Sequence, residues 1–338
     1  MKRILIVEGN LREENQSFTD GGIKTHTESL KDSISYFTDQ LDIDVVNPSS
    51  DENINEVAKD LTKYHGMIWG GSSLNIYNDT PEIRRQINFM RECQKNIKNI
   101  FAICWGMQVA VTVAGGEVKK CPNGAHRGIA HDIEINENGL KHPLYKNKNK
   151  KFNTPAFNFD EVVKLPEGST LLSSNPINKV MGINFNVGST NVWGIQYHPE
   201  ITYAKMISLI HFRRDRLLEK KAFIDQMEID SHVKIIEDEN KISNKDARMR
   251  ELENWLNNLN YNKPSISPFS FSLIESAAGT LGSPGIVMMA PHITTINSAP
   301  EDNLTSLIGN EWPVGAPFAF GSVEKLYCVF ATHIGKFP

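Results

Sequence analysis

The first hundred residues alternate short apolar runs with segments of helical period, and this alternation leaves few folds open to the chain. The apolar runs have strand length and lie at 4–7, 43–46, 66–69 and 100–103. The helical patterns between them lie at 25–41, 54–64 and 81–96. Strands that alternate with helices form βαβ units, in which helices cover both faces of a parallel sheet. We therefore expect an α/β fold with a mixed, mainly parallel sheet between two layers of helices.

The pattern changes between Gly116 and Val192, where short alternating segments are separated by Gly, Asn and Pro turns. His131–Ile135 alternates polar and apolar residues, which is typical of a half-buried strand. We expect antiparallel strands here that extend the sheet. A strand over 192–197 and a helix over 204–218 are predicted to follow.

Composition divides the chain into three parts. We expect one domain over residues 1–215, a charged helical extension over 216–262, and a segment of unknown fold over 263–338 that holds half of the sixteen prolines. Within the extension, residues 244–259 are predicted to form a surface helix that docks one apolar face. The residues of that face are Met249, Leu252, Trp255, Leu256 and Leu259.

Charge and hydropathy exclude several kinds of partner. The net charge is −4, and nucleic-acid binding needs a basic face, so we expect no nucleic-acid partner. No apolar run approaches the roughly 18 residues of a membrane helix, so no membrane association is expected. Met1–Val7 is followed directly by Glu8, which favours a buried strand over a signal peptide. The four cysteines are far apart, which predicts free thiols, a cytoplasmic location and no metal site.

The strongest local signal is the segment Ile100–Gln108, where an apolar run leads into Cys104. Ala102 lies two residues before the cysteine, Gly106 lies two residues after it, and a helix-like run follows. This is the pattern of a nucleophile elbow, a sharp turn from strand to helix. The turn exposes the thiol at a helix N-terminus, where the helix dipole favours the thiolate. The alternative is a buried structural cysteine at a strand end.

Two further segments supply the groups that such a cysteine needs. His198-Pro199-Glu200 follows the predicted strand over 192–197, and a histidine held by a carboxylate acts as general base and acid. Gly70-Gly71 follows the run over 66–69, and glycines there let backbone N–H groups point at a substrate oxyanion. Taken alone, each has an ordinary alternative, a surface histidine with an unrelated glutamate and a plain Gly-Gly turn.

Together these three segments resemble class I glutamine amidotransferases over roughly residues 1–215. The order and spacing match that family, and the elbow is most similar to the amidotransferase half of GMP synthase and its stand-alone relatives. The resemblance implies a flavodoxin-like amidotransferase fold, a Cys104–His198–Glu200 triad and an oxyanion hole. It also implies that substrate contacts come from Gly70, Gly71, Trp105, Gln108, Phe159 and Asp160.

The resemblance implies a glutaminase that hydrolyses the glutamine side-chain amide through a γ-glutamyl thioester, with no cofactor. The sequence lacks the Ser-Gly-Gly-Val-Asp-Ser-type phosphate loop of GMP synthase and any Walker motif. An ATP-dependent synthetase that uses the ammonia would therefore be a separate chain. Phe157-Asn158-Phe159 replaces a more usual Ser-His-Gly, so the substrate is glutamine or another γ-glutamyl compound. A γ-glutamyl hydrolase or peptidase, or a catalytically silent regulatory relative, is the alternative.

Overall fold

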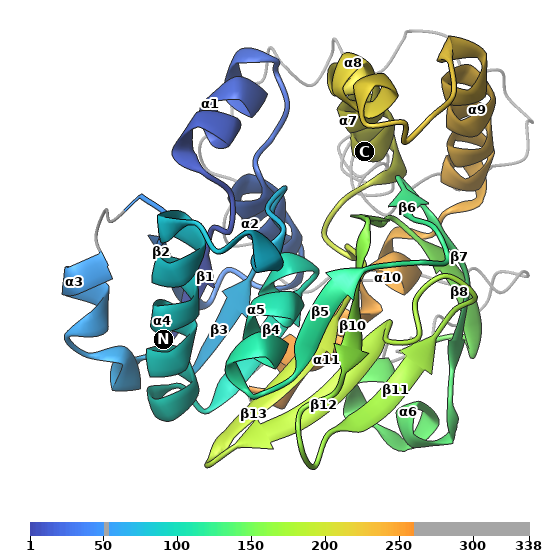
Figure 1. The fold of residues 1–338 in the computed structure, drawn as a ribbon. Helices are drawn as coiled ribbons and strands as arrows, with labels where there is room; N and C mark the ends of the chain where they lie inside the picture. Colours follow the sequence, from blue (N-terminus) through green and yellow to red (C-terminus); the bar gives the residue numbers. More distant parts are fainter. Residues whose placement is uncertain (51–53, 260–338) are drawn as a thin grey trace, which may run out of the picture. The chain divides into compact units, whose positions relative to one another are not determined.

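A sheet of nine strands runs through the centre of the protein (Figure 1). The computed structural model describes residues 1–50 and 54–259. The sheet is parallel from β2 to β13 and antiparallel from β13 to β8. In spatial order its strands are β2 (Leu41–Val46), β1 (Lys2–Val7), β3 (Gly66–Trp69), β4 (Asn99–Ile103), β13 (Thr190–Ile195), β12 (Gly182–Val187), β11 (Thr170–Ser174), β7 (Ala130–Ile135) and β8 (Lys151–Thr154).

The remaining elements are helices and two short ladders. One ladder pairs β5 (Glu117–Lys120) with β10 (Asp160–Lys164), and the other pairs β6 (His126–Arg127) with β9 (Phe157–Asn158). The helices are α1 (Arg12–Asp20), α2 (His26–Phe37), α3 (Ile54–Ala58), α4 (Pro81–Asn96), α5 (Trp105–Val113), α6 (Glu137–Lys141), α7 (Tyr203–Phe212), α8 (Arg214–Glu219), α9 (Gln226–Ile242), α10 (Lys245–Arg248) and α11 (Arg250–Asn258). Short 3₁₀ turns lie at Leu61–Lys63, Ile76–Asn78 and Pro143–Tyr145.

The core lies on both faces of the sheet because successive strand residues point to opposite sides. In β1, Leu5 and Val7 pack with residues of α4 and α5, whereas Ile4 and Ile6 pack with residues of α2 and α11. Figure 1 shows α4 and α5 in front of the strands and α11 behind them. The expected α/β fold with a mixed sheet and helices on both faces is confirmed.

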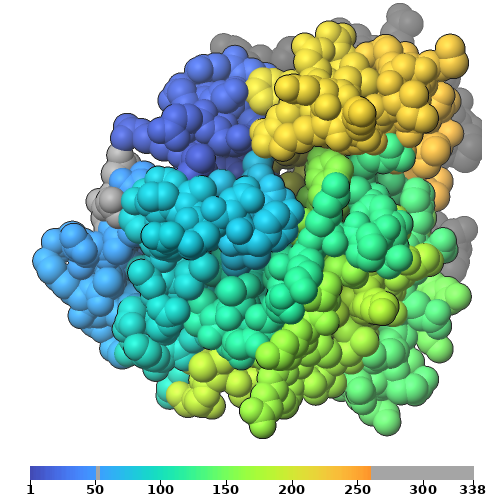
Figure 2. Space-filling view, in the orientation of Figure 1, coloured from blue at the N-terminus to red at the C-terminus, as the bar shows by residue number. Residues whose placement is uncertain are grey.

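Helix α1 was not predicted, and it packs against α7. Only Phe18 of α1 is buried, so the segment has no apolar period that would reveal a helix. The rings of Phe18 and Phe212 meet edge to face, with centroids 5.8 Å apart. Figure 2 shows the blue surface of α1 meeting the yellow surface of α7 and α8. The segment between β1 and α2 is thus held against α7 by this ring contact.

Some predicted boundaries were wrong. Leu41 has helical spacing with Leu30 and Ile34, but α2 ends at Phe37 and Leu41 begins β2, where it pairs with Lys2. The predicted helix over 244–259 is broken at Met249 into α10 and α11, although its apolar face is buried as expected.

The antiparallel strands predicted after Gly116 extend the sheet as β7, β8, β11 and β12. β5, β10, β6 and β9 lie outside that sheet. The domain boundaries at 215 and 262 stay predictions, and residues 263–338 lie outside the described residues. Within residues 1–50 and 54–259, no helix has the length and apolar character needed to cross a membrane.

Candidate active site

Cys104 occupies the turn between β4 and α5 with a strained backbone. Its φ is 52° and its ψ is −104°, a region that residues with a side chain rarely adopt. The turn is fixed by a hydrogen bond from the Cys104 amide to the Ile195 carbonyl, at 2.7 Å. A Cβ atom at Gly106 would lie 2.4 Å from the Trp69 carbonyl oxygen, so only glycine fits there. The geometry is that of the predicted nucleophile elbow.

His198 and Glu200 lie at the end of the neighbouring strand. β13 pairs in parallel with β4, and Ile195 is opposite Ile103, so both strands deliver their following residues to one edge of the sheet. His198 Nδ1 lies 2.7 Å from Glu200 Oε1, and both side chains are buried. Cys104 lies close enough to the imidazole to interact with it electrostatically. The structure therefore brings the three predicted catalytic residues together.

The charges around His198 favour its protonated form. Burial alone would lower the pKa of His198, but the Glu200 carboxylate and Cys104 outweigh it and raise that pKa to about 10. Cys104 therefore faces a group that is cationic at neutral pH. A thiol beside an imidazolium is readily converted to the thiolate, which is the nucleophilic form.

The Gly70-Gly71 turn lies beside this pair. The Gly70 amide donates a hydrogen bond to the Val7 carbonyl at 3.1 Å, and the Gly70 carbonyl accepts one from the Gly106 amide at 3.2 Å. Within the part of the chain that the structure describes, the amides of Gly71 and Trp105 have no hydrogen-bond partner. They are therefore available to a substrate oxygen, as an oxyanion hole requires.

The other predicted contacts are distributed differently. Gln108 is buried in α5, and its amide donates to Gln196 Oε1 at 3.4 Å. The Gln196 side-chain amide donates in turn to Cys104 Sγ at 3.4 Å. Gln196 is buried two residues before His198, and the sequence analysis did not identify it. Asp160 accepts hydrogen bonds from Asn75 and Tyr77 at 2.7 and 3.0 Å. The predicted role of Asp160 in substrate binding stays a prediction.

The side chains of Phe159 and Phe157 pack in the protein interior. The Phe159 ring packs against the cluster formed by α7 and α9, and its centroid lies 6.1 Å from that of Phe157. The Phe157 carbonyl, however, lies 4.0 Å from Cys104 Sγ. Backbone groups of this segment therefore border the thiol, and the predicted contact of Phe159 with substrate stays a prediction.

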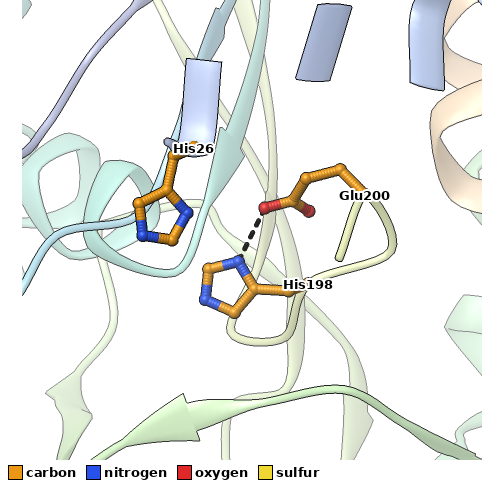
Figure 3. Close-up of side chains that lie close together, drawn as sticks. All are labelled: His26, His198 and Glu200. Atoms are coloured by element: carbon orange, nitrogen blue, oxygen red, sulfur yellow. Dashed lines mark hydrogen bonds and ion pairs between the residues drawn. The ribbon is translucent and has the colours of Figure 1, made fainter. Parts of the chain in front are cut away.

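His26 is a further buried residue of the site that the sequence analysis did not identify. Its ring stacks on that of His198 with centroids 5.4 Å apart and an interplanar angle of 25° (Figure 3). Its Nδ1 is buried without a hydrogen-bond partner among the described residues. Burial, together with the charges of Lys205, His198 and Arg213, holds the pKa of His26 well below its usual value. His26 is therefore neutral at physiological pH.

His26, His198 and Glu200 place three ligand-type atoms within 4.8 Å of one another. Such a group can in principle hold a metal ion. Burial and the charges of Lys205 and Arg213 lower the pKa of His26, and these two cations also oppose a divalent cation in the same space. The cluster is therefore described as a buried histidine with a carboxylate on one side and a second ring stacked on the other.

A family model described as "Glutamine amidotransferase class-I" matches residues 24–213. A γ-glutamyl-L-1-hydroxyisopropylamide hydrolase from a Pseudomonas species is 29% identical over 203 residues, which cover 59% of this chain and 68% of that protein. γ-Glutamyl peptidase 3 of Arabidopsis thaliana is 26% identical over 164 residues, covering 48% of this chain and 63% of that protein.

Two more similarities bear on the fold. A GMP synthase (glutamine-hydrolysing) from Thermosipho melanesiensis is 34% identical over 156 residues, which cover 46% of this chain but only 28% of that protein. A crystal structure of a glutamine amidotransferase from Thermotoga maritima matches with a TM-score of 0.54 and 18% identity, covering 76% of this chain and 97% of that chain. The last similarity concerns the fold alone.

The two glycines of the turn provide a matched pair of variants. A Cβ atom at Gly71 would lie 2.7 Å from His198 Cε1 and 3.0 Å from His26 Cε1, whereas one at Gly70 would meet only ordinary contacts of 3.5 Å or more. We expect Gly71→Ala to displace His198 and reduce kcat by about a hundredfold, the size of effect expected when a catalytic group is misplaced by about 1 Å. Gly70→Ala should stay close to the unmodified protein. Equal losses in both variants would contradict this geometry.

The raised pKa of His198 predicts a second result. In Glu200→Gln the ring loses the carboxylate that stabilises its charge, so His198 should lose its proton at lower pH than the value of about 10 in the unmodified protein. Nitrogen NMR of the histidine rings across the alkaline range measures this directly. A titration of His198 that is the same in both proteins would show that Glu200 does not set its charge.

Proposed function

Because the chain belongs to the class I glutamine amidotransferase family, we propose that it is a cysteine hydrolase that cleaves γ-glutamyl amides or γ-glutamyl peptides. The observation that carries this proposal is the buried Cys104–His198–Glu200 arrangement beside the Gly70-Gly71 turn. A thiol, an acid-base histidine and free backbone amides are the three parts that acyl transfer to cysteine needs.

In the proposed reaction, the Cys104 thiolate attacks the γ-carbonyl carbon of the substrate and a carbon–sulfur bond forms. The amides of Gly71 and Trp105 donate hydrogen bonds to the oxyanion. His198 then protonates the leaving nitrogen, the carbon–nitrogen bond breaks, and a γ-glutamyl thioester remains on Cys104. A water molecule gives a proton to His198 and attacks the thioester, which releases glutamate and restores the thiolate. Glu200 holds the imidazole in the orientation that these steps require.

The choice of substrate rests on the relatives and on one sequence departure. The Pseudomonas relative is named as a hydrolase of a γ-glutamyl amide, and the Arabidopsis relative as a γ-glutamyl peptidase. Phe157-Asn158-Phe159 borders Cys104 where the family more usually has Ser-His-Gly. We therefore favour a γ-glutamyl amide or peptide over glutamine itself. A glutaminase that supplies ammonia to a separate ATP-dependent synthetase is the second candidate, and the similarity to GMP synthase supports it.

Substitution of the nucleophile tests the catalytic assignment. Cys104→Ala should reduce γ-glutamyl hydrolysis by about a thousandfold or more, because no other group can form the thioester. Cys121→Ala is the matched control, since Cys121 is also a buried free cysteine and its Sγ contacts the Ile177 carbonyl. The measurement is release of glutamate by each folded protein. A folded Cys104→Ala chain with substantial turnover would rule out this mechanism.

A substrate panel separates the two candidates. We expect kcat/KM for a γ-glutamyl alkylamide or a γ-glutamyl dipeptide to exceed that for glutamine by about tenfold or more, the discrimination that one well-filled pocket provides. Glutamate release is measured for the three substrates with the isolated protein. Faster hydrolysis of glutamine, accelerated further by a synthetase from the same source, would support the glutaminase instead.

A further inference from the structure

The His198–Glu200 loop is held from behind by a helix pair that follows the family match in the chain. Arg248, at the end of α10, donates hydrogen bonds through Nη1 to the carbonyls of Pro199 and Ile201, the latter at 3.0 Å. These two carbonyls flank Glu200 on either side. Arg248 is only 9% exposed, so its guanidinium is committed to this contact. The backbone that carries the catalytic carboxylate is therefore fixed by a side chain outside residues 24–213.

A second contact joins Glu251 of the pair to Tyr197, the residue before His198. The Tyr197 hydroxyl lies 2.7 Å from Glu251 Oε1 of α11, and Glu251 Oε2 lies 3.0 Å from Lys148 Nζ. The Glu251 and Lys148 side chains are 0% and 5% exposed. Burial and the Glu251 charge raise the pKa of Tyr197 well above its usual value, so the hydroxyl stays protonated and donates. This contact restrains the residue immediately before His198.

The helix pair is itself anchored in the core. The rings of Trp255 and Phe101 stack with centroids 5.8 Å apart and an interplanar angle of 21°. Leu252 and Leu256 belong to the same buried cluster as Cys104. Because protein cores are close-packed and have low compressibility, a helix anchored in this way moves little itself. Arg248 and Glu251 therefore belong to helices that are packed firmly against the core.

We propose that α10 and α11 form a platform that sets the position of His198 and Glu200 for catalysis, with Arg248 as its positioning residue. This inference rests on the proposed function. Arg248 does not touch the reacting atoms and acts through the loop that it holds. An arginine suits this task because its planar group offers several donors in fixed directions, so one side chain can satisfy two carbonyls. A shift of about 1 Å at a catalytic group can cost about a hundredfold in rate.

Three full-length variants test the platform. Arg248→Met keeps an apolar side chain but removes the hydrogen-bond donors. Arg248→Lys keeps the positive charge but lacks the planar guanidinium group with its donors in fixed directions. Arg250→Met is the control. Arg250 forms an ion pair with Glu253 within α11 and not with the His198–Glu200 loop. The folded fraction of each preparation is measured by circular dichroism, and alkylation of Cys104 by iodoacetamide is counted by peptide mass spectrometry, which separates it from the other three cysteines. The turnover number per counted site and KM are then measured with a γ-glutamyl amide.

We expect kcat per counted site to fall by about tenfold to a hundredfold in Arg248→Met, with a smaller loss in Arg248→Lys and little change in KM. Arg250→Met should match the unmodified protein. If Arg248→Met does not fold, Arg248→Lys carries the test by the same criterion. An unchanged kcat per counted site, or a loss that only follows the fraction of folded protein, would overturn the proposal.

A second measurement separates this proposal from the proposed function. The rate of Cys104 alkylation at neutral pH needs no substrate, and it depends on how well His198 stabilises the thiolate. We expect alkylation to be several-fold slower in Arg248→Met than in Arg250→Met. If the unmodified protein hydrolyses no γ-glutamyl compound but this difference is found, the proposed function fails and the platform stands. Equal alkylation rates would refute the platform even in an active hydrolase.

Discussion

The pairing of β4 with β13 is the constraint on which the site depends. Because these parallel strands lie side by side, with Ile103 opposite Ile195, the residues that follow them meet at one edge of the sheet although they lie more than ninety positions apart in the chain. The Cys104 amide then donates to the Ile195 carbonyl, which continues the ladder into the elbow. The fold thus joins the proposed nucleophile and its proposed base without either residue lying on a long loop.

Around this junction, burial and charge are arranged so that the two histidines differ. Burial opposes the charge of both rings. Glu200 and Cys104 outweigh it at His198 and raise that pKa, whereas at His26 burial is reinforced by nearby cations and the pKa is lowered. The stacked rings therefore carry different charges at neutral pH, which avoids two adjacent imidazolium groups. A charged ring is available for proton transfer, and a neutral ring fills the space behind it.

Much of this could be predicted from sequence because the signals were local. The elbow at Cys104, the Gly70-Gly71 turn and the His198–Glu200 pair each lie beside a strand with a clear apolar pattern, and the strands at 66–69 and 100–103 appear where they were expected. His26, Gln196 and Arg248 were missed because their roles come from tertiary contacts between distant segments. Leu41 was assigned to a helix because its spacing fits one, while its pairing with Lys2 places it in a strand.

The proposed reaction requires Cys104 to carry a covalent γ-glutamyl group during turnover. Its most direct test is mass spectrometry of the protein after it has been mixed with a γ-glutamyl amide and quenched in acid within one turnover. Peptide mapping should locate a γ-glutamyl thioester on Cys104, with none on Cys93 or Cys121. An unmodified Cys104 in a preparation that is releasing glutamate, or a γ-glutamyl group attached to another residue, would contradict the account.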